Sequence, residues 1–184
     1  MPETDMERIP PRIPPREPAS LITQGLVAVL RQEFRLDWGG IHGAAHWARV
    51  RRNGLYLARL TGANARVVEY FAFLHDACRH SDGHDPGHGP RAVGFARDIR
   101  EAHIDLDDLE FSLLLAAMEG HTSGRRHRDV TVSACWDADR LDLARVGIEP
   151  DPARLCTVPA RDPEVIRRAS AAATRWVERY FGRG

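Results

Sequence analysis

The feature that most constrains the fold is the spacing of apolar residues between residues 63 and 77. Apolar side chains recur there at helical spacing, and in the second half they cover nearly the whole circumference, through Tyr70, Phe71, Phe73 and Leu74. A helix that is apolar on all sides must be buried. No run in the chain alternates polar and apolar residues for long enough to form a strand. We therefore predict an all-α fold with this helix in the centre of the core.

Gly- and Pro-containing loops divide the rest of the chain into further segments with helical patterning. Ser20 is the expected N-cap of the first helix because its hydroxyl can accept a backbone hydrogen bond. The expected helices cover residues 20–35, 42–60, 63–77, 88–102, 107–119, 132–145 and 163–181. The sequence therefore predicts one bundle of about six to seven helices, in a single domain that spans residues 19–184.

The first eighteen residues differ from this domain in composition. Residues 1–18 contain half of the twelve prolines, and successive prolines favour an extended chain without amide donors. We expect a flexible arm, with a PxxP-type partner ligand as the alternative. This segment has no apolar stretch like that of a secretory signal peptide. No segment approaches the roughly 18 apolar residues of a membrane span, so we expect no membrane contact.

The cysteines and the charge balance narrow the class further. Cys78, Cys135 and Cys156 are widely spaced and odd in number, which favours buried reduced thiols in a cytoplasmic protein. The chain has 26 basic and 26 acidic residues, whereas a nucleic-acid-binding protein usually carries a basic excess. All basic residues are arginines, so Schiff-base chemistry and a Walker-type lysine are excluded. The nine histidines are the residues to follow.

The pair His75-Asp76 stands where the most apolar helix ends. Buried polar groups are costly unless they are satisfied, and imidazole with carboxylate is a common ligand set for divalent metals. An isolated pair of this kind is more often structural, but His42 and His46 also share one face of a predicted helix. An inward carboxylate from residues 137–142 would complete a His, His-Asp, Asp set, which helical bundles use for metals.

The ordered set of these motifs resembles a known superfamily. An H-x-x-R-V run begins at His46, a helix ends in His75-Asp76, and Ala-Asp-Arg-Leu surrounds Asp139. Over about residues 41–146 this order resembles the HD-domain metal-dependent phosphohydrolases, which implies an HD-domain-like helical fold. The resemblance implies that a divalent metal is held by His46, His75, Asp76 and Asp139, with Asp137 as the competing choice for the last ligand. The metal would be Mn, Fe, Ni, Zn, Co or Mg, with one or two ions per chain.

Other polar residues are expected near that centre. His88 and His121 resemble histidines that bind a second metal or the substrate phosphate in such proteins, although each could be a surface residue. Arg79 could hold phosphate oxygens in a bidentate manner, with a surface salt bridge as its alternative role. The predicted catalytic residues are Asp76, Arg79, His88 and His121, and the last three also bind substrate.

The remaining histidines and one basic loop are less informative. His42, His80 and His84 are expected at the rim of the site, or in solvent. His103 and His127 are expected to be ordinary surface residues. The basic loop could steer an anionic substrate but is more typical of a solvated loop; it contains Arg125, Arg126 and Arg128.

The resemblance implies hydrolysis of a small phosphoester, a monoester or diester such as a nucleotide, by a metal-activated water. Arg79 stands where five-prime deoxynucleotidases have glutamate and triphosphohydrolases have histidine. The paired acidic residues of stringent-response hydrolases and the GYP motif are absent. The pattern therefore favours the small, generic HD hydrolases. Two alternatives remain open: an HD-fold di-iron oxygenase that uses the same ligands, and a non-catalytic binding module that acts through its proline-rich arm.

Overall fold

The computed structural model describes residues 20–182, so the predicted arm at residues 1–18 lies outside the described residues. Residues 20–182 contain eight α-helices, three short 3₁₀ helices and no strand, which confirms the all-α prediction. The helices are α1 (Gln24–Glu33), α2 (Ala44–Thr61), α3 (Ala65–Leu74), α4 (His88–Asp98), α5 (Arg100–His103), α6 (Asp108–Gly120), α7 (Val130–Arg140) and α8 (Pro163–Phe181). The 3₁₀ helices are η1 (Leu143–Val146), η2 (Pro152–Arg154) and η3 (Pro159–Arg161).

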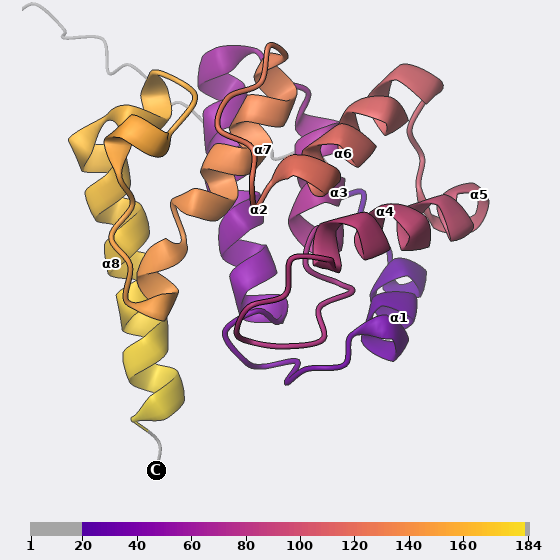
Figure 1. Ribbon diagram of the computed structural model, residues 1–184, viewed down its shortest axis with the longest axis horizontal. Helices are drawn as coiled ribbons and strands as arrows, with labels where there is room; N and C mark the ends of the chain where they lie inside the picture. The colour runs from indigo at the N-terminus through magenta and orange to yellow at the C-terminus, as the bar shows by residue number, and fades with distance from the viewer. Residues whose placement is uncertain (1–19, 183–184) are drawn as a thin grey trace, which may run out of the picture.

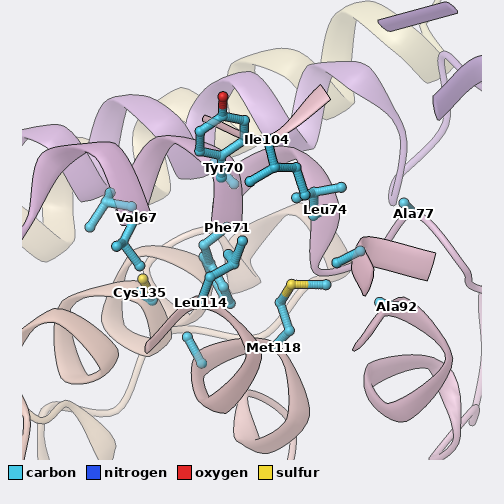
Figure 2. Close-up of a cluster of buried hydrophobic side chains, with 14 of the residues drawn as sticks. Val67, Tyr70, Phe71, Leu74, Ala77, Ala92, Ile104, Leu114, Met118 and Cys135 are labelled. Carbon is cyan, nitrogen blue, oxygen red and sulfur yellow. The ribbon is translucent and has the colours of Figure 1, made fainter. Parts of the chain in front are cut away.

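Helix α3 lies in the middle of the bundle and contacts α2, α6 and α7 (Figure 1). Its Phe71 and Leu74 are fully buried, and Figure 2 shows that they face Leu114 and Met118 of α6. Removal of apolar side chains from water is the main force that stabilises such a core. Helix α8 stands at one edge of the molecule and α5 at the opposite edge (Figure 1). The prediction that residues 63–77 form the central helix is thus confirmed.

Local signals fix where α3 begins and ends. Its N-cap is Asn64, whose side chain accepts hydrogen bonds from the backbone of Arg66 and Val67, as N-cap residues do. The preceding helix ends at Gly62, where φ is +76°, a conformation that favours glycine. At the other end the last regular residue is Leu74. The His75-Asp76 pair therefore leaves the helix inside the core instead of at the surface.

The first two helices begin later than predicted. The N-cap of α1 is Thr23, whose hydroxyl accepts from the Leu26 backbone, whereas Ser20 donates to the Glu69 carboxylate at 2.6 Å. Helix α2 begins after Gly43, which approaches the Trp38 carbonyl so closely that a Cβ there would lie 2.2 Å from that oxygen. His42 consequently precedes α2 and does not share a helix with His46.

Two predicted helices are shorter or divided. The segment 88–102 is interrupted at Ile99, so it forms α4 and α5, and the count rises to eight. The segment 132–145 ends as an α-helix at Arg140, after which the chain turns into η1. Asp142 lies in that turn with its carboxylate against His46 and Arg49. The turn thus places the Asp142 carboxylate behind His46.

The burial of the cysteines and the length of the apolar helices can be compared with the predictions. The three cysteines are free, and Cys78 and Cys135 are buried as predicted, whereas Cys156 is only half-buried because it lies in an irregular segment. Within residues 20–182, no helix is both long and apolar enough to cross a membrane.

Candidate metal centre

Three helices bring four polar side chains together. His46 comes from the first turn of α2, His75 and Asp76 follow α3, and Asp139 lies near the end of α7. The Nε2 atoms of His46 and His75 are 3.2 Å apart. Asp76 Oδ2 lies 3.6 and 3.7 Å from these two nitrogens, and Asp139 Oδ1 lies 3.5 and 3.8 Å from them. The structure thus brings together all four residues that the resemblance implied as ligands.

The hydrogen bonds of the two histidines determine which nitrogen is free to ligate. His46 Nδ1 lies 2.7 Å from Asp142 Oδ2, and His75 Nδ1 lies 3.1 Å from the Phe71 carbonyl. Since both partners only accept, each Nδ1 donates its hydrogen, and each Nε2 is left to ligate. Burial lowers the pKa of His75 to about 3, which keeps its ring neutral. The Nε2 lone pair of His75 therefore faces His46 Nε2 across 3.2 Å.

A second group adjoins the first on the other side of Asp76. His88 Nε2 and His121 Nε2 are 2.7 Å apart, and they lie 3.2 and 3.7 Å from Asp76 Oδ1. Each ring donates its Nδ1 hydrogen to a backbone carbonyl, that of Asp85 or Met118. Asp76 consequently faces one His pair with each of its two oxygens. Two buried groups of three residues could each hold a metal ion. One consists of His46, His75 and Asp76, and the other of Asp76, His88 and His121.

The electrostatics of the second group differ from those of the first. Burial lowers the pKa of His88, but at His121 the contact with Asp76 outweighs burial and raises the pKa. Burial alone would raise the pKa of Asp76, yet His75, His121 and Arg79 favour the anion and hold this pKa well below its usual range. Asp76 is therefore a carboxylate inside the protein.

Asp139 and Asp137 have opposite surroundings. Both oxygens of Asp137 accept hydrogen bonds from the segment before η3, at 2.6 Å from Cys156 N and at 2.7 and 2.8 Å from Thr157 N and Oγ1. Asp137 therefore fastens a loop and lies outside the cluster. Asp139 Oδ1 is buried without a hydrogen-bond donor. Burial would raise the pKa of Asp139, but His75 and Arg145 outweigh it and lower the pKa to about 2.

Asp142 and Arg49 support the first group from behind. Arg49 donates to both oxygens of Asp142, at 2.6 and 2.9 Å, while Asp142 accepts from His46. The guanidinium of Arg49 also stacks on Trp176 of α8, 4.6 Å from the ring centroid. A carboxylate behind a ligating histidine fixes its tautomer and raises its basicity. The orientation of His46 is therefore set by three further side chains.

The spacing of the donors fits a metal ion. With bonds of about 2.1 Å, two ligands of one ion lie about 3.0 Å apart in octahedral and about 3.4 Å apart in tetrahedral coordination. The measured separations in the first group run from 3.2 to 3.8 Å. Neutral imidazoles and carboxylates are donors for Zn, Mn, Fe, Ni and Co. A cation between these residues would satisfy Asp139 Oδ1, which has no hydrogen-bond donor, and would bind the Nε2 atoms of His46 and His75.

A cavity of about 380 Å³ opens onto the cluster. Its lining includes Asp76, His121 and Asp139 of the cluster and three apolar residues, Leu143, Val146 and Ile148. Its remaining lining is polar or charged and consists of His42, Arg79, Asp82, Thr122, Arg140, Arg145, Glu149, Asp151 and Arg154. The cavity gives a small molecule access to Asp76 and Asp139.

Two arginines that line this cavity lie beside the cluster. Arg79 Nη1 lies 3.4 Å from Asp76 Oδ1 and 3.5 Å from His88 Nε2, while its other nitrogens donate to carbonyls of the loop after α3. Arg145 Nη1 lies 3.9 Å from Asp139 Oδ1. Fixed guanidinium groups at such a position suit an anion with several oxygens.

The other predicted residues divide between rim and scaffold. His42 is buried, lines the cavity and lies 2.8 Å from Asp82, as a rim residue would. His80 and His84 are exposed, as are the three arginines of the basic loop at 125–128. His103 and His127 are partly exposed, and neither belongs to the two groups of possible metal ligands. The ring of His127 packs edge-on against Trp136.

Sequence reasoning missed the roles of Arg49, Asp142 and Arg145. The first stands within the H-x-x-R-V motif, three residues after His46, which is the spacing of neighbours on a helix. Asp142 belongs to the same acidic run, residues 137–142, as the predicted ligand Asp139. Its contact with His46 forms in the turn that follows the end of α7 at Arg140. Helix ends are set by local competition that periodicity does not report.

No family model matches the chain, and neither a curated protein nor a solved structure matches it. The assignment of the centre therefore depends on its geometry and on the motifs that the chain itself carries.

Proposed function

We propose that this protein is a metal-dependent phosphohydrolase that acts on a small phosphoester such as a nucleotide. The observation that carries the proposal is the set of donors around Asp76: a pair of imidazole nitrogens on each side of one carboxylate, with the unpartnered Asp139 Oδ1 beside them. Their order along the chain is that of the HD-domain superfamily, which supports the same assignment. A proton shared by His46 and His75 would leave Asp139 Oδ1 without a partner.

The residues divide the chemical work. His46, His75, Asp76 and Asp139 would hold one divalent ion, and His88 and His121 with Asp76 would hold a second. Such an ion polarises a phosphoryl oxygen and lowers the pKa of its bound water. Arg79 would bind the phosphoryl group and stabilise the negative charge that develops on it, because its guanidinium is held in place by the loop carbonyls. The apolar residues that line the cavity would contact the rest of the substrate.

The direct experiment is elemental analysis of purified protein, followed by a phosphatase and phosphodiesterase panel with the metal found. The double variant His75→Ala, Asp76→Ala should lose both the metal and the activity. A matched control is His80→Ala, His84→Ala, because these two histidines are exposed in the loop that follows Asp76. Full activity in the metal-free first variant would overturn the proposal.

A di-iron oxygenase is the second candidate, and one observation favours it. Six donors surround two adjacent positions that share Asp76, an arrangement that would also suit two irons. The cationic Arg79 at the centre favours a phosphoester instead. Phosphate release under anaerobic conditions with Mn or Ni would support hydrolysis, whereas turnover that requires oxygen and two irons per chain would support the oxygenase. Metal-free protein whose partner binding needs residues 1–18 would indicate a binding module.

A further inference from the structure

A second cavity, of about 280 Å³, lies between α2 and α8. Four arginines line it, together with Asn53 and Tyr56 of α2, and no aspartate or glutamate does. No residue that lines it also lines the cavity at the metal centre. We call it the arginine groove; its cationic residues are Arg52, Arg167, Arg168 and Arg175.

Three of these arginines form no ion pair within the described residues. Arg167 is paired with Glu164, at 2.6 and 2.8 Å. Within residues 20–182, Arg52, Arg168 and Arg175 form no ion pair. The groove therefore places several guanidinium groups that form no ion pair around one small volume.

The arginines also repel one another. Arg168 and Arg175 are seven residues apart on α8, so they lie on the same face of that helix, two turns apart. Arg52 faces them from α2. Burial lowers the pKa of Arg52, and although Asp142 opposes this shift, Arg49, Arg175 and Arg168 add to it. An anion bound among these guanidinium groups would offset their mutual repulsion.

We propose that the arginine groove binds a small phosphate-bearing molecule of the nucleotide type, with Arg52, Arg168 and Arg175 on its phosphate oxygens. Guanidinium groups match the planar pairs of oxygens that phosphate presents. Tyr56 lines the same cavity with a ring that is 39% exposed, and an aromatic face of this kind can stack against a base. The site is separate from the metal centre, so a phosphoester would bind this protein at two places.

Calorimetric titration of the full chain with AMP and with pyrophosphate tests this site. Arg175→Ala should weaken binding in the groove about tenfold or more, and Arg168→Ala with Arg175→Ala should abolish it, since charge-assisted hydrogen bonds are lost. Arg179→Ala is the matched control: it removes the same charge from the next turn of α8, where Arg179 lines neither cavity. Binding in the control should equal that of the wild type.

Further arms separate the groove from the metal centre and from non-specific attraction. Arg79→Gln should leave the groove component of binding unchanged, because Arg79 lies at the other cavity. Acidic peptides of equal charge should bind more weakly than AMP. Equal binding by Arg175→Ala and Arg179→Ala would overturn the proposal, as would tighter binding of the peptide or the absence of any groove component in the wild type. Metal content is measured in parallel, so failure of this site leaves the proposed hydrolase untouched.

Discussion

The two halves of the metal centre share Asp76 but are built differently. The half with His46 and His75 has a carboxylate behind one ligand and a further carboxylate, Asp139, whose buried oxygen lacks a donor. In the half with His88, both rings are supported by backbone carbonyls and the cavity reaches His121. The cavity also reaches Asp139 of the first half, so the two halves differ in how their ligands are supported and not in access.

The electrostatics sharpen this difference. A proton on His121 Nε2 could satisfy both His88 and Asp76, and the pKa of His121 is raised accordingly. In the first half the pKa of His75 is about 3, so its ring stays neutral. A metal ion would satisfy Asp139 Oδ1 in the first half, whereas a proton on His121 can satisfy the second half without one. We expect the first half to bind its ion more tightly.

The largest expected effect comes from Asp76→Ala, which removes the residue that both halves share. Metal content should fall to near zero, and phosphoesterase activity should fall by about 10³-fold or more because charge stabilisation is lost. Elemental analysis and kinetics on the same preparation check both. Circular dichroism should show an intact fold; loss of helix would instead assign Asp76 a structural role.

Asp139→Asn and Asp137→Asn should separate metal binding from stability. Asp139→Asn should weaken metal binding by at least about a hundredfold, more than a supporting residue would, with little loss of stability. Asp137→Asn should keep the metal but destabilise the fold by about 2–3 kcal/mol, because a donor group would face the backbone N–H of Cys156 or Thr157. Equilibrium denaturation and metal titration of both variants check this prediction. Loss of metal in Asp137→Asn, or a large loss of stability in Asp139→Asn, would contradict it.

Asp142→Asn should have an intermediate effect on the first half alone. The amide still accepts one hydrogen bond but no longer balances Arg49 or holds the His46 tautomer. Affinity for the tighter ion should drop by about 10–100-fold, while affinity for the second stays the same. A competitive chelator titration measures both, and an equal loss at the two positions would contradict the distinction between them.

Acidification should release the two ions in sequence, which is the smallest effect. Because the pKa of His121 is raised, a proton competes for its Nε2 at a higher pH than it would at an ordinary histidine. His75, with a pKa of about 3, meets such competition only in much stronger acid. Metal retained after dialysis at each pH reports the order, and simultaneous release of both ions would count against it.

Sequence reasoning identified the central helix from the apolar pattern within one segment, and it named the residues of the cluster from the order of short motifs along the chain. The apolar run before His75 has to be buried, and a polar pair at its end has to be satisfied. What sequence reasoning missed depends on chain geometry across segments. The turn that brings Asp142 to His46 follows from the end of α7, and the groove of Arg52 and Arg175 exists only once α8 packs beside α2.

The most direct test of the central claim is the number of metal ions per chain, measured by elemental analysis after loading with Mn, Fe, Ni, Co or Zn and removal of excess. The wild type should hold two ions, His88→Ala one and Asp76→Ala none. A wild type that holds no ion with any of these metals would contradict the account, as would a His88→Ala variant that holds as many ions as the wild type.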